Sequence, residues 1–118
     1  MPAKPLEARV RHRRGGAVID LHGEIDGFAQ DALDSAYAEA ERRDPEAILL
    51  NFAGVSYINS TGIALIVGLL AKARAAKRRL LASGLSGHYA EIFSVTRLSD
   101  FVHVFPDEES AMSGATRR

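Results

Sequence analysis

The chain has 118 residues, of which 47% are hydrophobic and 25% charged, a composition typical of one globular domain with a core of ordinary size. Fifteen basic and fifteen acidic side chains cancel to a formal charge of +0, so no net field favours nucleic acid or an anionic membrane as partner. The absence of cysteine excludes disulfides, thiolate metal sites and cysteine nucleophiles. No signal-like segment opens the chain and no apolar run approaches the ~20 residues that span a bilayer, so we expect a cytoplasmic protein.

Two strands joined by a tight turn are expected near the N-terminus. Apolar Leu6, Ala8 and Val10 alternate with charged residues at the period of a half-buried strand. Gly15-Gly16 is typical of a hairpin turn, and the second strand should cover residues 17–22. Because no aromatic residue separates the arginines of the first strand, we interpret them as the solvated face of an edge strand rather than a nucleic-acid contact.

Asp26 is expected to begin the first helix, which should end before Asp44-Pro45. The apolar residues of this helix form a stripe that should face the sheet: Phe28, Leu33, Ala36, Tyr37 and Ala40. Glu24 and Asp26 suggest acid–base chemistry, but the sequence offers no nucleophile to work with them. We therefore interpret them as a loop carboxylate and a helix cap, and leave open a role in partner recognition.

A buried strand, a polar turn and an apolar helix follow one another from residue 48 to residue 70. Residues 48–50 form a continuous apolar run, the mark of a strand covered on both faces, and Gly54 is expected to let the chain turn. Asn59 should cap the following helix, because its side-chain oxygen can accept from a free amide of the first turn. Ser60 and Thr61 then stand at the positive end of that helix.

This second helix is more apolar than one buried face requires. Ile63, Ile66, Val67 and Leu70 should face the sheet, while Leu65 and Leu69 should lie on the far side. The extra apolar surface, which includes close-approach positions at Ala64 and Gly68, fits either packing against another helix of the domain or contact with a partner.

Four further elements are expected before the C-terminus. A strand at 80–83 is followed by a helix striped by Tyr89, Ile92 and Phe93, a strand at 101–105, and a short helix opened by Pro106. The alternation of strands and helices predicts right-handed crossovers and parallel pairing. The expected fold is therefore α/β: a single domain over 6–112 with loose ends at 1–5 and 113–118, in which about four helices pack on a mixed sheet of four to five strands.

The segments Asn51-Phe-Ala-Gly-Val and Ile58-Asn-Ser-Thr-Gly-Ile resemble the signature of STAS domains, the fold of bacterial anti-sigma factor antagonists. That signature reads roughly Asp-Phe-Ser-Gly-Val, then Ile-Asp-Ser-Ser/Thr-Gly-Leu-Gly. Leu21-His-Gly-Glu-Ile-Asp26 and the segment 93–101 resemble two further motifs of the family. The chain departs from the pattern at Asn59, where the family has Asp, at Ala64, where it has Gly, and at Arg97, where it also has Gly.

The resemblance implies a regulatory binding module that sequesters an anti-sigma factor, itself a serine kinase, and so frees a sigma factor. Ser60 would be the phosphoacceptor, with Thr61 as the alternative, and phosphorylation would abolish binding. The implied partner-binding residues are Glu24, Asp26, Asn59, Ser60, Thr61, Gly62, Ala64 and Leu65. Asn59 keeps the helix cap but removes a carboxylate beside the acceptor, which bears on phosphorylation rather than on the fold.

Two alternatives remain open. The chain could be a scaffold subunit of a stress-signalling assembly or a lipid-transport complex, or a domain that binds a nucleotide or small molecule at the same turn. We expect no enzyme, since phosphate-binding, dinucleotide-binding and nucleophile-elbow motifs are all missing. The four histidines lack ligand-like spacing, so no metal or cofactor is expected. The oligomeric state is left open.

Overall fold

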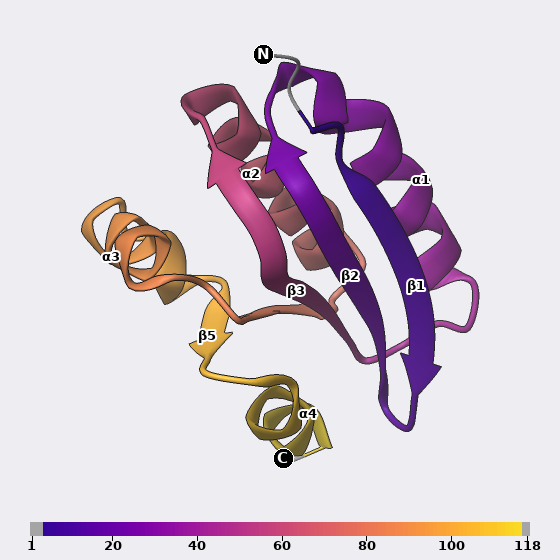
Figure 1. Cartoon of the computed structure of the whole chain (residues 1–118). Coiled ribbons are helices and arrows are strands. Elements are labelled where there is room, and N and C mark those ends of the chain that lie inside the picture. The colour runs from indigo at the N-terminus through magenta and orange to yellow at the C-terminus, as the bar shows by residue number, and fades with distance from the viewer. Residues whose placement is uncertain (1–3, 117–118) are drawn as a thin grey trace.

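The computed structural model describes residues 4–116, which form one mixed sheet with helices on both faces (Figure 1). The sheet order is β1-β2-β3-β4-β5; β1 pairs with β2 antiparallel and all other pairs are parallel. The expected α/β fold is thus confirmed. The elements are β1 (Glu7–Arg13), β2 (Gly16–Ile25), the 3-10 turn η1 (Gly27–Ala29), α1 (Gln30–Glu41), β3 (Ala47–Ile58), α2 (Ser60–Ala75), β4 (Arg79–Ser83), α3 (Gly87–Val95), the 3-10 turn η2 (Leu98–Asp100), β5 (His103–Phe105) and α4 (Glu108–Thr116).

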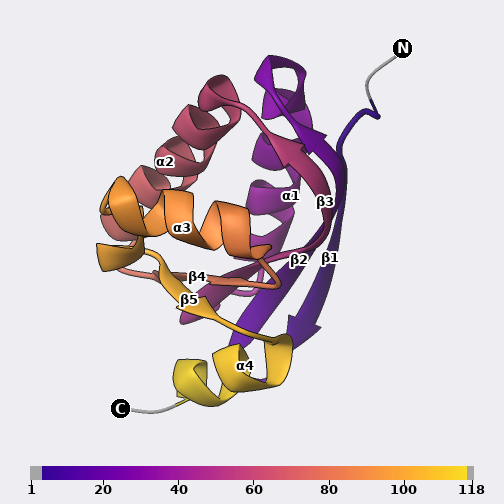
Figure 2. The same cartoon turned by 60° about the vertical axis from the view of Figure 1, so that its left-hand side comes forward.

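The core lies in two layers that the pleat of the central strands separates. On one face, side chains such as Ile48 and Leu50 pack with α1, α2 and the buried Phe93 of α3. On the other face, Leu49 and its neighbours pack against Met112 of α4. Figure 2 shows α4 on the opposite side of the sheet from α1 and α2. Because both faces of β3 are covered, its first four residues, 47–50, are all apolar and buried.

The strand β3 is much longer than expected, and the predicted turn at Gly54 is wrong. β3 runs unbroken from Ala47 to Ile58, and Gly54 lies within it opposite His22 of β2. A Cβ at Gly54 would collide with the His22 ring and lie 2.8 Å from the Leu21 carbonyl oxygen. The glycine therefore serves the close pairing of two strands, at the point where the register of β2 and β3 shifts, rather than a change in chain direction.

The long β3 outruns its neighbour β4, and this shapes the end of the sheet where the candidate site lies. β4 ends at Ser83, which pairs with Asn51, so the last seven residues of β3 pair only with β2. Two side chains accept hydrogen bonds from backbone amides along the unpaired edge of β3. The Asn51 side chain accepts from the Ala53 amide at 3.1 Å, and the Tyr89 hydroxyl of α3 accepts from the Ile58 amide at 2.9 Å. Side chains thus replace a missing strand along this edge.

The buried face of α2 is rotated relative to the expected one. Ile66, Leu69 and Ala73 are buried against the core, whereas Val67, expected to face the sheet, is 46% exposed. Leu65, expected on the far side, is partly buried against the same core. The helix is apolar around most of its circumference, so its periodicity could not determine which residues face the sheet.

Ordered structure continues beyond the expected limits of 6–112. The Lys4 carbonyl accepts from the Glu24 amide at 3.1 Å, and α4 extends to Thr116. The rest of the expected loose ends, residues 1–3 and 117–118, lies outside the described residues. Within the described range, no helix is long and apolar enough to cross a membrane.

Candidate functional site

The candidate site is the junction between β3 and α2, where the adjacent β2 also ends. Ile25 and Ile58, the last residues of β2 and β3, are paired in register, so both strands stop at the same level. The Asn59 amide then donates to the Ile25 carbonyl at 3.2 Å, which ties the junction to β2. Ends of this kind, at the carboxyl edge of parallel strands, are where open α/β sheets place binding sites.

Asn59 caps α2, as expected from the sequence. Its side-chain oxygen accepts from the Gly62 amide at 2.8 Å, and its backbone carbonyl accepts from the Ile63 amide at 2.9 Å. Ser60 and Thr61 occupy the first helical positions, and both are exposed. In the described part of the chain their two amides have no hydrogen-bond acceptor, so the positive end of the α2 dipole faces solvent beside two hydroxyl groups.

Gly62 lets α2 start directly against the end of β2. This residue is buried, and a Cβ there would lie 2.8 Å from the Ile25 carbonyl carbon and closer still to the carbonyl oxygen. No side chain fits in that space. The contact fixes the height at which the first turn of α2 stands above the sheet, and so places Ser60 and Thr61 at the surface.

Asp26 and its neighbours form the other wall of the site. The Asp26 carboxylate accepts from the Phe28 amide at 2.9 Å and so caps η1 rather than α1 itself. η1 packs beside the start of α2, since a Cβ at Gly27 would lie 3.5 Å from the Thr61 methyl group. Asp26 is therefore a cap, but of a short 3-10 turn rather than of the first α-helix, which it was expected to begin and which starts at Gln30. It lies on the same side of the molecule as the Ser60 and Thr61 hydroxyls.

Phe28 lies outside the helix in which the sequence places it. The prediction that it belongs to the buried stripe of α1 is wrong, because Phe28 belongs to η1 and is 95% exposed. The 3-10 turn changes the helical phase ahead of α1, so the stripe that reaches the core begins at Leu33. Tyr57, at the end of β3, is 48% exposed and pairs in register with Glu24. Two aromatic side chains thus stand exposed on elements that border the hydroxyl pair, and sequence periodicity alone did not reveal them.

The other expected partner-binding residues divide into two groups. Glu24 is half-buried on β2, and Ala64 is exposed on the second turn of α2. Leu65 packs against the hydrophobic core and Gly62 is buried, so these two support the site from beneath rather than offering surface. The structure thus brings Asp26, Asn59, Ser60 and Thr61 together at one end of the sheet.

Comparison with known proteins identifies the family. The sequence profile of the STAS domain matches residues 7–111. The chain belongs to the STAS domain family. A relative named anti-sigma-B factor antagonist, from Staphylococcus epidermidis, is 29% identical over 86 residues, which are 73% of this chain and 80% of the relative.

Solved structures share the fold. An anti-sigma factor antagonist from Mycobacterium paratuberculosis superposes with a TM-score of 0.76 at 19% identity, covering 95% of each chain. The Bacillus cell fate determinant SpoIIAA in its phosphorylated form superposes with a TM-score of 0.68 at 23% identity, over 90% of this chain and 96% of that one. At these identities the superpositions establish the architecture alone.

Proposed function

We propose that this STAS domain is an anti-sigma factor antagonist: it binds an anti-sigma factor and so releases a sigma factor. The observation that carries the proposal is the exposed Ser60 directly after the Asn59 cap, at the carboxyl end of β3, on a chain whose relatives carry that name. The binding surface comprises the start of α2 together with Glu24, Asp26 and the exposed Phe28.

Phosphorylation of Ser60 by the anti-sigma factor would switch this surface off. A phosphate adds close to two negative charges, which the two free amides of the first turn and the helix dipole would tolerate without unfolding. The same phosphate would be strongly hydrated, and a partner would have to strip that water away to contact the turn. Binding would therefore weaken while the fold persists.

The phosphoacceptor is tested by incubating the chain with its cognate kinase and ATP, and by mapping the modified residue with mass spectrometry. Modification at Ser60 supports the proposal, whereas modification confined to Thr61, or to neither hydroxyl, refutes the assignment. In a binding assay with the unphosphorylated partner, Ser60→Asp should lose affinity and Ser60→Ala should retain it. Equal affinities would remove Ser60 from the interface.

The exposed aromatic residue offers a separate test of the binding surface. Phe28→Ala should leave stability within about 0.5 kcal/mol, because the side chain is almost fully exposed, yet it should weaken partner binding at least tenfold if Phe28 anchors the complex. Val104→Ala is the matched control, since it truncates an exposed apolar residue on the edge strand β5. If both variants bind like the parent chain, the partner does not use the η1 surface.

The substitution of Asn59 for the family's Asp bears on the switch. If a carboxylate at this position orients the acceptor or meets a basic group of the kinase, Asn59→Asp should speed phosphorylation of Ser60 and leave the unphosphorylated complex unchanged. If this chain belongs to an unswitched branch of the family, neither form will be phosphorylated and binding will be constitutive. A large loss of affinity in Asn59→Asp would contradict both outcomes and assign the Asn59 amide a direct contact.

A further inference from the structure

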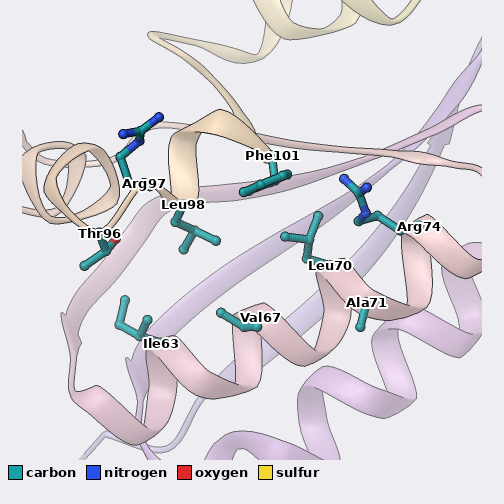
Figure 3. Close-up of a pocket in the computed structure, with 9 residues that line it drawn as sticks. All are labelled: Ile63, Val67, Leu70, Ala71, Arg74, Thr96, Arg97, Leu98 and Phe101. Carbon is teal, nitrogen blue, oxygen red and sulfur yellow. The ribbon is translucent and has the colours of Figure 1, made fainter.

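A second surface lies along α2, away from the hydroxyl pair. A groove of about 510 Å³ runs between one face of α2 and the segment that follows α3. In Figure 3, Ile63, Val67 and Leu70 project from α2 toward Leu98 of η2, and Phe101 lies above Leu70. Most of the groove lining is therefore aliphatic and aromatic carbon, and its polar residues are Arg74, Thr96 and Arg97.

The domain leaves this apolar surface only partly covered. α2 already buries Ile66, Leu69 and Ala73 against the sheet, which gives it one complete core face. Val67 and Phe101 line the groove from opposite walls and are 46% and 51% exposed. Exposed apolar side chains that face each other across a hollow differ from the scattered ones normal on any surface, and they indicate a binding site.

Positive charge marks the rim of the groove. The Arg74 guanidinium lies 5.3 Å from the centre of the Phe101 ring, and no carboxylate of the described residues lies within ion-pair distance of it. Arg97, on the opposite wall, donates to Asp100 at 2.6 Å and is largely neutralised. A ligand that fills the groove would therefore find one available cation, at the C-terminal end of α2, and an acidic group would complement it.

The side of α2 next to the groove is built for close approach. Ala64, Gly68 and Ala71 follow one another at spacings of four and three residues, and all three are exposed. A Cβ at Gly68 would meet nothing within 4 Å. The ridge from Ile63 to Arg74 extends about 16 Å at 1.5 Å per residue, or about three helical turns. This length and flatness suit a second helix lying along α2.

We propose that the groove binds an amphipathic helix of a partner protein, with its apolar side chains between α2 and η2 and an acidic residue against Arg74. This interaction goes beyond the proposed contact at Ser60 and does not depend on it. A second copy of this chain is a poorer occupant, because α2 carries no acidic residue that could meet Arg74 in an α2–α2 contact and the outer face of α1 is polar. Its exposed residues are Gln30, Asp31, Ser35, Ala38 and Glu39.

The test uses the full chain, labelled with ¹⁵N, and two synthetic blocked helical peptides. Both peptides carry three Leu at positions i, i+4 and i+7; one carries two Glu in its last turn and the other two Lys. The acidic peptide should bind saturably and at least tenfold more tightly than the basic one, and should shift the amide resonances of Ala64, Gly68 and Ala71. Binding that shifts only the amides of the Ser60 turn, or no saturable binding by either peptide, would overturn the proposal.

Two protein variants make the test specific. Arg74→Glu should reverse the preference between the two peptides, and Lys77→Glu, which makes the same charge change on an exposed residue outside the groove lining, should leave it unchanged. Gly68→Leu should block binding by filling the approach surface, and its near-parent urea midpoint would show that the fold is intact. Equal effects of Arg74→Glu and Lys77→Glu would refute the proposed charge contact.

Two other occupants are outcomes of the same experiment. Dodecanoate, added as a third probe, would assign the groove to a small amphiphile if it shifted the same amides while neither peptide bound. Sedimentation at several concentrations would assign it to a second copy if the chain formed a dimer that Gly68→Leu abolished. Either result would overturn the proposal. None of these measurements involves a kinase or a sigma factor, so their failure would leave the role of Ser60 untouched.

Discussion

The two glycines of α2 give opposite predictions for one substitution, because only one of them contacts the sheet. Gly68 faces open space, so Gly68→Ala should stabilise the helix by about 1 kcal/mol through lower backbone entropy in the unfolded chain and better helix propensity. Gly62→Ala should gain the same stabilisation from backbone entropy and helix propensity. It also forces a methyl group against the Ile25 carbonyl, and overpacking of this kind costs about 1–3 kcal/mol.

The difference between the two variants isolates the contact between α2 and β2, since the propensity term is common to both. Gly62→Ala should therefore be less stable than Gly68→Ala by about 1–3 kcal/mol. Urea unfolding followed by far-UV circular dichroism measures the difference, provided that the unfolding free energy of both variants falls with urea concentration at the same slope. If Gly62→Ala proved as stable as Gly68→Ala, the close approach of the two elements would be wrong, and with it the reason for the height of Ser60 above the sheet.

Three further perturbations test the site and its surroundings. Asn59→Ala should lower the free energy of unfolding by about 1 kcal/mol, because it removes the cap of α2. Asn59→Asp should change the free energy of unfolding by no more than about a few tenths of a kcal/mol, and urea unfolding measures both effects. Tyr89→Phe should destabilise by about 1–3 kcal/mol and speed hydrogen exchange of the Ile58 amide, which loses its acceptor. The hydrogen bond from Arg11 holds the pKa of Asp20 below its ordinary 3.8, so this pair stabilises the fold above that pH and the stabilisation is lost as pH falls through the lowered pKa. Asp20→Asn should accordingly reduce the loss of stability between about pH 5 and pH 3; an unchanged loss would show that the pair contributes nothing.

Local signals in the sequence predicted those parts of the fold that local interactions determine. The cap at Asn59 depends on a hydrogen bond to the amide three residues along the chain. The hairpin, predicted at Gly15-Gly16, turns at Arg14-Gly15 and depends on the positive φ of Gly15. The order of strands and helices followed from alternating hydrophobic segments. The candidate hydroxyls Ser60 and Thr61 were found in the same way, because a cap fixes the position of the residues that follow it.

The features that the sequence did not predict are set by contacts between distant segments. The full length of β3 depends on its pairing with β2, and that pairing turns the apparent turn residue Gly54 into a strand residue. The exposure of Phe28 depends on a 3-10 turn that shifts the phase of α1. Val67 lies outside the core because α2 is apolar on several sides, so that only its packing partners determine its rotation. The groove could not be predicted, since its opposite walls come from Val67 and Phe101, which are far apart in the chain.

The two proposed binding surfaces share α2, yet they should respond differently to phosphorylation. At 1.5 Å per residue, Ile63 at the near end of the groove lies about 4.5 Å along the helix from Ser60. Arg74, at the far end, lies about 21 Å along the helix from Ser60. The Debye length is about 8 Å at physiological ionic strength, so a charge at Ser60 is largely screened at Arg74. Ser60→Asp should therefore weaken binding of the anti-sigma factor and change the affinity of the acidic peptide by less than about twofold, as a ¹⁵N titration will measure. A tenfold loss of peptide affinity would show that the turn and the groove form one continuous surface, and that phosphorylation controls both.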